Sequence, residues 1–235
     1  MMPRTKRPRR VHTDAREDIL RAAARLFVKK GYEATTMQDI VRAAETSIGN
    51  VYFYFENKEA LAWTLLEEAA TSSWEWTDEA VATVPPGPER LAVMVMANAT
   101  NLLGMNAGLT KILLLGATTK TLRERVAEKF ALRIREYINA NAAAFSSDQL
   151  DWVVAAWIGA ARNCIEQRLS GNLTGEPLEI GAFVVRWNLR GLGVPEKEID
   201  AAIATGTRVV ALWDAQRSGE HRAPHFPVSK TVLRA

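Results

Sequence analysis

Cysteine and histidine are scarce in this sequence of 235 residues. Its one cysteine, Cys164, excludes an internal disulfide framework and any metal site that needs a cysteine pair. We expect it to be a small buried residue on a helix. The three histidines are His12, His221 and His225, and all lie near the termini, where chains are usually poorly ordered. We therefore expect no metal site and no enzyme built on a buried histidine base.

Long hydrophobic runs are also missing. The longest purely apolar stretches, such as LAVMVMA at 91–97, are much shorter than the roughly 18 residues that cross a bilayer. The first ten residues are basic, but no apolar segment follows them, so a secretory signal is not predicted. The composition is 48% hydrophobic and 24% charged, which is typical of a soluble globular protein. We expect no membrane association and a cytoplasmic location.

Motifs that bind nucleotides or support hydrolysis are absent as well. The segment LLLGATTKT at 113–121 ends like a phosphate loop, but Leu114 and Thr119 stand where that motif needs glycines. The sequence contains neither a glycine-flanked serine elbow nor an HExxH motif. We therefore predict no catalytic residues and no cofactor. The alternative is an enzyme whose active site is formed by Asp or Glu side chains of a helical domain in an arrangement that none of these motifs describes.

Positive charge is concentrated at the start of the chain. Residues 1–10 carry five basic side chains and no acidic one, whereas the rest of the chain carries 25 basic and 27 acidic residues. We treat residues 1–12 as a flexible basic arm. Such an arm is either a solvated tail or an electrostatic contact for phosphates.

Between residues 13 and 60 the apolar pattern predicts three short helices. The first ends at Gly31, because glycine readily adopts the left-handed backbone conformation that terminates an α-helix. The second, in TTMQDIVRAA, is predicted to begin with a capping box of Thr35 and Gln38. After the break ETS, Ser47 can cap the third. This layout is typical of a helix-turn-helix, although a plain three-helix bundle would show similar periodicity.

Helical periodicity continues from residue 61 to residue 216. Asn57 can cap a fourth helix from Lys58 to about Ser73, and the prolines of VPPGPE break the pattern after it. The later helices are predicted at 89–105, at about 119–145, from the cap Ser147 to Leu169, from the end of the loop at 170–177 to about Arg190, and at about 195–216. The segment LTKILLLGA at 109–117 is a short apolar piece between the first two.

No strand pattern is present, so we predict an all-α fold. It would contain an N-terminal three-helix helix-turn-helix domain at 13–60 and a C-terminal helical domain at 61–216. Residues 217–235 lack periodicity and are expected to form a disordered tail.

Amide side chains interrupt an apolar face of the predicted helix at 89–105. Buried amides need hydrogen-bond partners, and a ligand cavity of mostly apolar character would supply them. An ordinary core is the alternative. The candidate ligand-binding residues are Met94, Asn98, Asn101, Met105, Trp152 and Asn163.

The segment ILRAAARLFVKKGYEATTMQDIVRAAETSIGNVYFYFENKEAL, within residues 14–61, resembles the DNA-binding domain of the TetR family of transcriptional regulators. The matching motifs are AARLF, GYEATT, DIV, GNVYFYF and NKEAL. The resemblance implies that the third helix enters the major groove of double-stranded DNA. It also implies that the fourth helix leads to an all-helical domain for effector binding and dimerisation.

The resemblance also implies roles for single residues. Ser47, Ile48, Gly49 and Asn50 would lie nearest the bases. Phosphates would be held by Tyr52, Lys58 and either Thr35 or Thr36, with Phe53 and Tyr54 at the groove edge and Val51 and Phe55 in the domain core. The full set of expected DNA contacts is Thr35, Thr36, Thr46, Ser47, Ile48, Gly49, Asn50, Tyr52, Phe53, Tyr54 and Lys58.

Three positions depart from the common family pattern. Glu45-Thr46 stands where Gly-Val is usual, and Tyr54 replaces a frequent histidine. Ile48 replaces a frequent lysine or arginine, which favours an apolar contact such as one with a thymine methyl group.

These features together predict a ligand-responsive regulator that binds a palindromic operator as a homodimer. The expected form is a repressor that a small-molecule effector releases from DNA. A transcriptional activator of the same fold, and a helical small-molecule-binding protein without DNA binding, are the alternatives.

Overall fold

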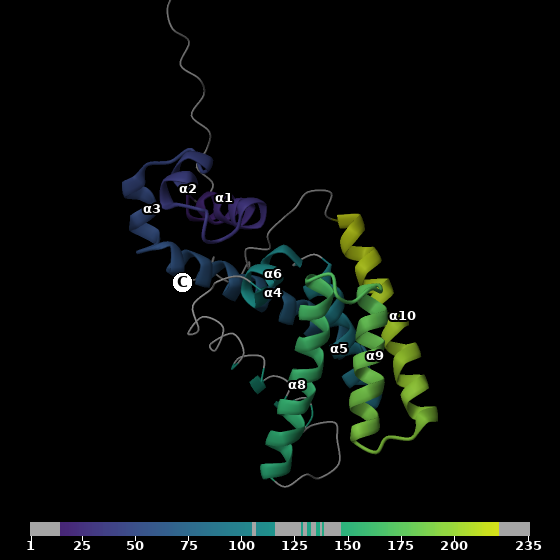
Figure 1. Cartoon of the computed structure of the whole chain (residues 1–235). Helices are drawn as coiled ribbons and strands as arrows, with labels where there is room; N and C mark the ends of the chain where they lie inside the picture. Colours follow the sequence, from purple (N-terminus) through teal and green to yellow (C-terminus); the bar gives the residue numbers. More distant parts are fainter. Residues whose placement is uncertain are drawn as a thin grey trace, which may run out of the picture. The chain divides into compact units, whose positions relative to one another are not determined.

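The computed structural model describes residues 15–104, 107–115, 128, 131–132, 135–136, 138 and 147–220. Over these ranges every regular element is an α-helix, so the all-α prediction is confirmed (Figure 1). The chain divides into two compact units, one ending at Ala62 and one beginning at Trp63. Within the described ranges, no helix is both long enough and apolar enough to span a membrane.

The N-terminal unit consists of α1 (Ala15–Lys30), α2 (Met37–Ala43), α3 (Ile48–Tyr54) and the first residues of α4 (Lys58–Ala82). Gly31 adopts a φ of 86° directly after α1, as the sequence predicts for its stop. The Asn57 side chain accepts a hydrogen bond from the amide of Ala60, which confirms it as the cap of α4. Fully buried apolar side chains from α1, α2 and α3 form the core of this unit: Ile19, Leu20, Ala23, Phe27, Ile40 and Val51.

The predicted capping box at the start of α2 is wrong by one residue. The cap is Thr36, whose hydroxyl oxygen accepts from the Asp39 amide, and the Asp39 carboxylate accepts from the Thr36 amide. Asp39 also forms ion pairs with Lys30 at the end of α1 and with Arg42 one turn later. These donors, first the Lys30 ammonium and then Thr36, lower the pKa of Asp39 below its usual range.

The turn between α2 and α3 contains a non-glycine residue in the left-handed region. Glu45 has a φ of 51°. Three successive amides in this turn donate to carbonyls of α2: Ala44 to Ile40, Glu45 to Arg42 and Thr46 to Val41. The three backbone amides of the turn are thereby satisfied within the domain.

The C-terminal unit contains the rest of α4, which reaches Ala82 and so extends past the predicted end at Ser73. The other helices are α5 (Pro88–Leu103), α6 (Ala107–Leu115), α8 (Ser147–Leu169), α9 (Pro177–Gly191) and α10 (Glu196–Glu220). The last helix therefore continues beyond the predicted end at residue 216. In the predicted helix at 119–145, the described positions are helical, and Ile138 is fully buried.

The predicted basic arm at 1–12 and residues 221–235 of the predicted tail lie outside the described residues. Met105, one of the candidate ligand-binding residues, lies outside them too.

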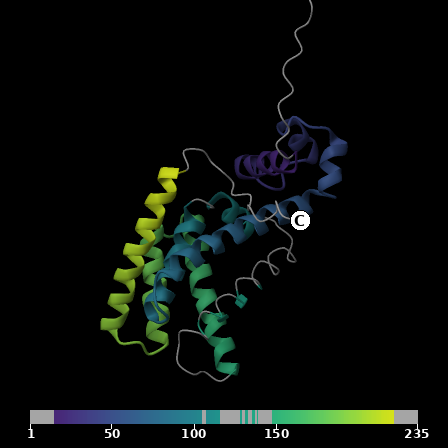
Figure 2. The ribbon, with the colours of Figure 1, turned by 180° about the vertical axis from the view of Figure 1, so that it is seen from behind.

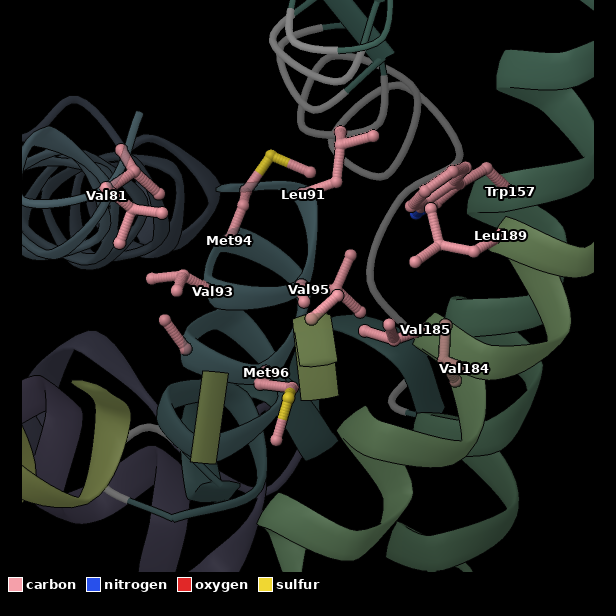
Figure 3. Close-up of a cluster of buried hydrophobic side chains, with 14 of the residues drawn as sticks. Val81, Leu91, Val93, Met94, Val95, Met96, Trp157, Val184, Val185 and Leu189 are labelled. Carbon is pink, nitrogen blue, oxygen red and sulfur yellow. The ribbon is translucent and has the colours of Figure 1, made fainter. Parts of the chain in front are cut away.

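Helix α5 is the centre of the C-terminal unit, and α9 and α10 pack against it and against each other (Figure 2). Seven consecutive residues of α5, from Leu91 to Ala97, are buried, because neighbouring helices cover this helix on several sides. Figure 3 shows Met94, Val95 and Met96 among side chains from α4, α8 and α9. This all-round burial explains why the segment reads as an apolar run in the sequence.

Two glycines allow the close approach of α9 and α10 to α5. A Cβ atom at Gly181 of α9 would lie 2.9 Å from the Met96 Cα, and one at Gly206 of α10 would lie 2.5 Å from the Met96 sulfur. Both distances are shorter than van der Waals contact. Met96 is fully buried between the two glycines.

Ion pairs connect the end of α9 to the start of α10. Arg186 donates to Glu196 at 2.9 Å and to Asp200 at 2.6 Å, and Arg190 pairs with Glu196. The Arg190 hydrogen bond is the main cause of the lowered pKa of Glu196. Cys164 on α8 is free and half-buried, rather than buried as expected, and burial raises the pKa of its thiol.

Candidate DNA-binding surface and ligand pocket

Helix α3 begins with a side-chain cap. The Ser47 hydroxyl oxygen accepts from the Asn50 amide at 3.1 Å, so the predicted cap is confirmed. The Asn50 side chain points back toward the turn, and its Nδ2 donates to the Thr46 hydroxyl oxygen at 2.8 Å. Because both bonds connect the first turn of α3 to the residues before it, they fix the direction in which the helix leaves the turn.

The four consecutive aromatic residues divide between solvent and core. Phe55 is buried, as is Val51 one turn before it, so both predicted core positions are confirmed. Tyr52, Phe53 and Tyr54 are exposed to solvent, and the exposed fraction of Phe53 is 79%. The rings of Phe53 and Tyr54 pack edge to face with their centroids 5.0 Å apart. An exposed aromatic pair of this kind is suited to a binding partner.

The outward face of α3 bears no charge. The helix reads IGNVYFY, and Ile48 at its first position is exposed. Gly49 is exposed as well, and a Cβ atom there would meet nothing within 4 Å. This surface can therefore offer hydroxyl, amide and apolar contacts to base edges.

The two candidate threonines before α2 lie in different environments. Thr35 is 1% exposed, and its hydroxyl donates to the Gly31 carbonyl at 2.7 Å. Its side chain is therefore committed to the interior, and the expectation that it holds a phosphate is corrected. Thr36 is exposed, but its hydroxyl donates to Asp39 at 2.8 Å.

Lys58 at the start of α4 is engaged inside the unit. Its Nζ donates to the Tyr32 carbonyl at 2.8 Å and to the Glu33 carbonyl at 3.3 Å. The same ammonium lies 4.3 Å from the centroid of the Tyr32 ring. The pKa of Tyr32 is raised, mainly because the residue is partly buried and secondarily because Glu59 and Glu33 are near.

The C-terminal unit contains a pocket of about 440 Å³. Its wall comes from α4, the end of α5, the start of α9 and the last turns of α10. The charged lining residues are both acidic, Glu176 and Asp214, and no described lysine, arginine or histidine lines the pocket. The lining residues are Trp76, Thr100, Asn101, Gly104, Glu176, Pro177, Leu178, Val210, Ala211, Asp214 and Ala215.

Among the described candidate ligand-binding residues, only Asn101 lines this pocket. Met94 belongs to the hydrophobic core, and the Asn98 side-chain amide donates to the Met94 carbonyl within α5. Trp152 and Asn163 are exposed on α8. None of these four residues lines this pocket, so their assignment to a ligand site stays a prediction.

The sequence reasoning missed the pocket residues of α9 and α10. Glu176 follows a loop, and Asp214 lies in the last turns of α10, so no periodic signal relates them. Packing of both helices against α5 brings them to one pocket. Within the described ranges, no group of three or more His, Cys, Asp or Glu side chains is placed to hold a metal ion.

Comparison with known proteins identifies the N-terminal unit. Residues 19–63 match the family described as "Bacterial regulatory proteins, tetR family". The chain is 40% identical over 68 residues to the HTH-type transcriptional regulator QacR of Staphylococcus aureus, a match that covers 28% of this chain and 36% of QacR. It is 34% identical over 89 residues to the regulator EthR of Mycolicibacterium smegmatis, covering 37% of this chain and 41% of EthR.

These sequence matches span about a third of the length of the curated relatives. The similarity to solved structures covers more of the chain than the sequence matches do. A TetR-like transcriptional regulator from Rhodococcus sp. RHA1 aligns with 80% of this chain and 99% of its own, with a TM-score of 0.59 and 19% sequence identity. This comparison shows a common fold of an N-terminal helix-turn-helix unit and a C-terminal helical unit. Residues 19–63 therefore match the DNA-binding domain of the TetR family of bacterial regulatory proteins, and the chain as a whole shares the fold of a TetR-like transcriptional regulator.

Proposed function

We propose that the protein is a ligand-responsive transcriptional regulator that binds double-stranded DNA through the exposed face of α3. The observation that carries this proposal is the arrangement of α3 itself. Ser47 caps the helix, Val51 and Phe55 hold it in the core, and the opposite face is left to solvent. A capped helix with a free polar and aromatic face is the usual geometry of a recognition helix in the major groove.

The contacts that we propose fall into two classes. Thr46, Ser47, Ile48, Gly49 and Asn50 lie at the start of α3 and would read base edges. The exposed residues Thr36, Tyr52, Phe53 and Tyr54 would contact the sugar-phosphate backbone and so fix the register of the helix on the duplex.

A homodimer is supported by the exposed apolar side chains of α8 and α9. Trp152 of α8 is 71% exposed, and Phe183 and Trp187 of α9 are 60% and 64% exposed. Phe183 and Trp187 are one helical turn apart, so they share a face. Large aromatic groups on adjacent helices are suited to burial against a second copy. A two-fold dimer would then bind a palindromic operator.

The pocket of the C-terminal unit is the proposed effector site. Trp76, Pro177, Leu178 and Val210 offer apolar surface, and the amide of Asn101 offers a polar contact. Since the charged lining groups are carboxylates, a neutral or cationic molecule would enter more easily than an anion, whose charge Glu176 and Asp214 would repel.

We propose that the effector releases a repressor from its operator. Release requires that DNA and effector favour different states of the protein. The regulator would act in the cytoplasm, without a cofactor and without catalysing a reaction. An activator of the same fold is the nearest alternative, and an effector-binding protein that has lost DNA binding is the other. The exposed, capped α3 favours DNA binding over the latter.

Selection of bound sequences from random duplex DNA by the purified full-length protein tests this function. We expect recovery of a palindromic site, with binding lost on replacing Asn50 and Tyr52 together by alanine. Val28→Ala, which changes an exposed residue of α1, is the matched control and should retain binding. Recovery of no sequence, or unchanged binding by the Asn50/Tyr52 double variant, would reject the proposed surface.

A second measurement addresses the pocket. Organic molecules of similar size and of negative, zero or positive charge are titrated into the protein bound to the selected DNA. We expect release by a neutral or cationic compound, and weaker release in the Asp214→Asn variant when the active compound is a cation. Preferential release by anions would contradict the proposed charge selection.

A further inference from the structure

Two acidic side chains line the pocket of the C-terminal unit, and they come from different helices. Glu176 precedes the first residue of α9, and Asp214 lies in the last turns of α10. Neither forms an ion pair with a basic side chain among the described residues. The acids at the start of α10 differ, because Glu196 and Asp200 both pair with Arg186 of α9. The pocket wall therefore carries two uncompensated negative charges.

Of these two acids, Glu176 has a structural reason for its charge. A carboxylate at the N-terminal end of a helix is stabilised by the helix dipole, and Glu176 occupies that position on α9. Asp214 lies inside α10, where the residues one turn before it, Val210 and Ala211, are apolar. Its charge on the pocket wall is therefore available to a ligand.

Thr100 of α5 adds an independent observation. Its hydroxyl oxygen is buried, and no described residue forms a hydrogen bond with it. Thr100 lines the same pocket. A buried hydroxyl without a partner costs free energy, and a polar molecule in the pocket would remove that cost by supplying the partner.

The other lining groups fit an organic molecule better than a metal ion. Pro177, Leu178 and Val210 lie beside the indole of Trp76, and an aromatic ring attracts a cation that lies over its face. The volume of about 440 Å³ is in the range of sites for small organic molecules. Hard metal cations instead need six or more oxygen ligands. Over the described ranges, no three His, Cys, Asp or Glu side chains are grouped to hold a metal ion.

We propose that this pocket selects an apolar organic cation, with Asp214 as the main counter-ion and the apolar lining around the body of the molecule. The inference rests on the proposed role of the pocket as the effector site. It narrows the class of effector from neutral or cationic molecules to cations.

Three probes of similar size separate charge from shape. They are benzyl alcohols that carry a trimethylammonium, a tert-butyl or a sulfonate group at the para position, so that the first two share one shape and differ in charge. Each is titrated calorimetrically into the full-length protein without DNA. We expect the ammonium compound to bind about tenfold more tightly than the tert-butyl compound, and the sulfonate to bind most weakly.

Asp214→Asn should lower the affinity for the ammonium compound about tenfold and leave the affinity for the tert-butyl compound unchanged. The matched control is Glu198→Gln, which removes an exposed carboxylate from the start of the same helix. It should keep the preference for the cation. Equal binding of the ammonium and tert-butyl compounds by the wild type would overturn the proposal, as would an Asp214→Asn variant that behaves like the control. Binding of none of the three compounds would also overturn it.

A titration of the same compounds into the protein bound to its selected DNA separates this inference from the proposed function. If the ammonium compound binds with the expected preference but leaves the DNA bound, the role of the pocket as effector site fails and the cation site stands. If the tert-butyl or sulfonate compound releases the DNA and the ammonium compound does not bind, the cation selectivity fails and the effector role stands.

Discussion

The Asn50 side chain donates a hydrogen bond to the Thr46 hydroxyl oxygen across the start of α3, with 2.8 Å between Nδ2 and Oγ1. This bond orients the amide, because it directs the nitrogen toward the turn and leaves the carbonyl oxygen of the same planar amide on the side away from the Thr46 hydroxyl. A fixed acceptor on the exposed surface is suited to the exocyclic amino group of adenine or cytosine.

Replacing the acceptor should release the amide. We expect Thr46→Val to reduce the preference for the selected operator over a scrambled duplex by about fivefold, since a bidentate pair with a base is worth about 1–3 kcal/mol and a single oriented contact lies at the low end of that range. Thr46→Ser keeps the hydroxyl and is the control. Competition binding with both duplexes measures the effect, and equal discrimination by Thr46→Val and wild type would show that the bond does not matter.

Ile48 should contact a thymine methyl group. Replacing the contacted thymine by uracil removes one methyl group, and we expect an affinity loss of about fourfold, which corresponds to about 0.8 kcal/mol. Ile48→Ala should lose affinity for the thymine site and become insensitive to this replacement. Uracil scanning of the selected operator identifies the position. If uracil at every thymine weakened both proteins equally, the assigned contact would be wrong.

Trp187 should lie in the proposed dimer interface. A charge buried there would be costly, so we expect Trp187→Glu to yield monomers in sedimentation velocity and to weaken operator binding at the same protein concentration. Leu212→Glu is the control, because Leu212 is exposed to a similar degree on α10. It should remain dimeric. A dimeric Trp187→Glu would remove this face of α9 from the interface.

Gly181→Ala should destabilise the C-terminal unit more than Gly206→Ala. The new methyl group at Gly181 would meet the Met96 backbone, whereas the one at Gly206 would mainly meet the flexible Met96 sulfur. We expect about 1–3 kcal/mol for Gly181→Ala. Gly191→Ala, whose methyl would meet nothing within 4 Å, should be nearly neutral. Denaturant unfolding of the three variants ranks them, and the reverse order would contradict the described packing.

Asp39→Asn should destabilise the N-terminal unit at neutral pH. The folded-state pKa of Asp39 lies below the value of an unfolded chain. Its contribution to stability is therefore complete above pH 4, near the ordinary aspartate pKa of about 3.9, and it is lost as the pH falls toward the lowered value. The difference in melting temperature between wild type and variant should shrink between pH 7 and pH 3. Asp148→Asn, which removes an exposed carboxylate from α8, is the control for the change in net charge.

Much of the N-terminal unit could be predicted from the sequence because local signals decide it. Gly31, Ser47 and Asn57 mark helix ends by their own backbone or side-chain chemistry. The assignment of Val51 and Phe55 to the core came from the family resemblance, and their spacing of one helical turn is consistent with it. The predicted capping box of Thr35 and Gln38 was wrong because the Thr35 side chain is buried and its hydroxyl donates to the Gly31 carbonyl.

The pocket could not be predicted because it depends on contacts between distant helices. Asn98 and Asn101 lie on the same helix, yet Asn98 bonds within α5 and Asn101 lines the pocket. Which of them faces a cavity is decided by the helices packed around α5. Lys58 is a similar case, since its partners Tyr32 and Glu33 are brought near it by tertiary structure and not by spacing.

The left-handed Glu45 in the turn before α3 has a consequence for the entropy of DNA binding. A non-glycine residue costs about 1–2 kcal/mol in this conformation, but it has fewer alternative backbone states than a glycine would have. The bonds of Ala44, Glu45 and Thr46 to α2 restrict the turn further. Because the turn is ordered before DNA arrives, little conformational freedom remains to be lost when α3 enters the groove, and the free protein is preorganised for its operator.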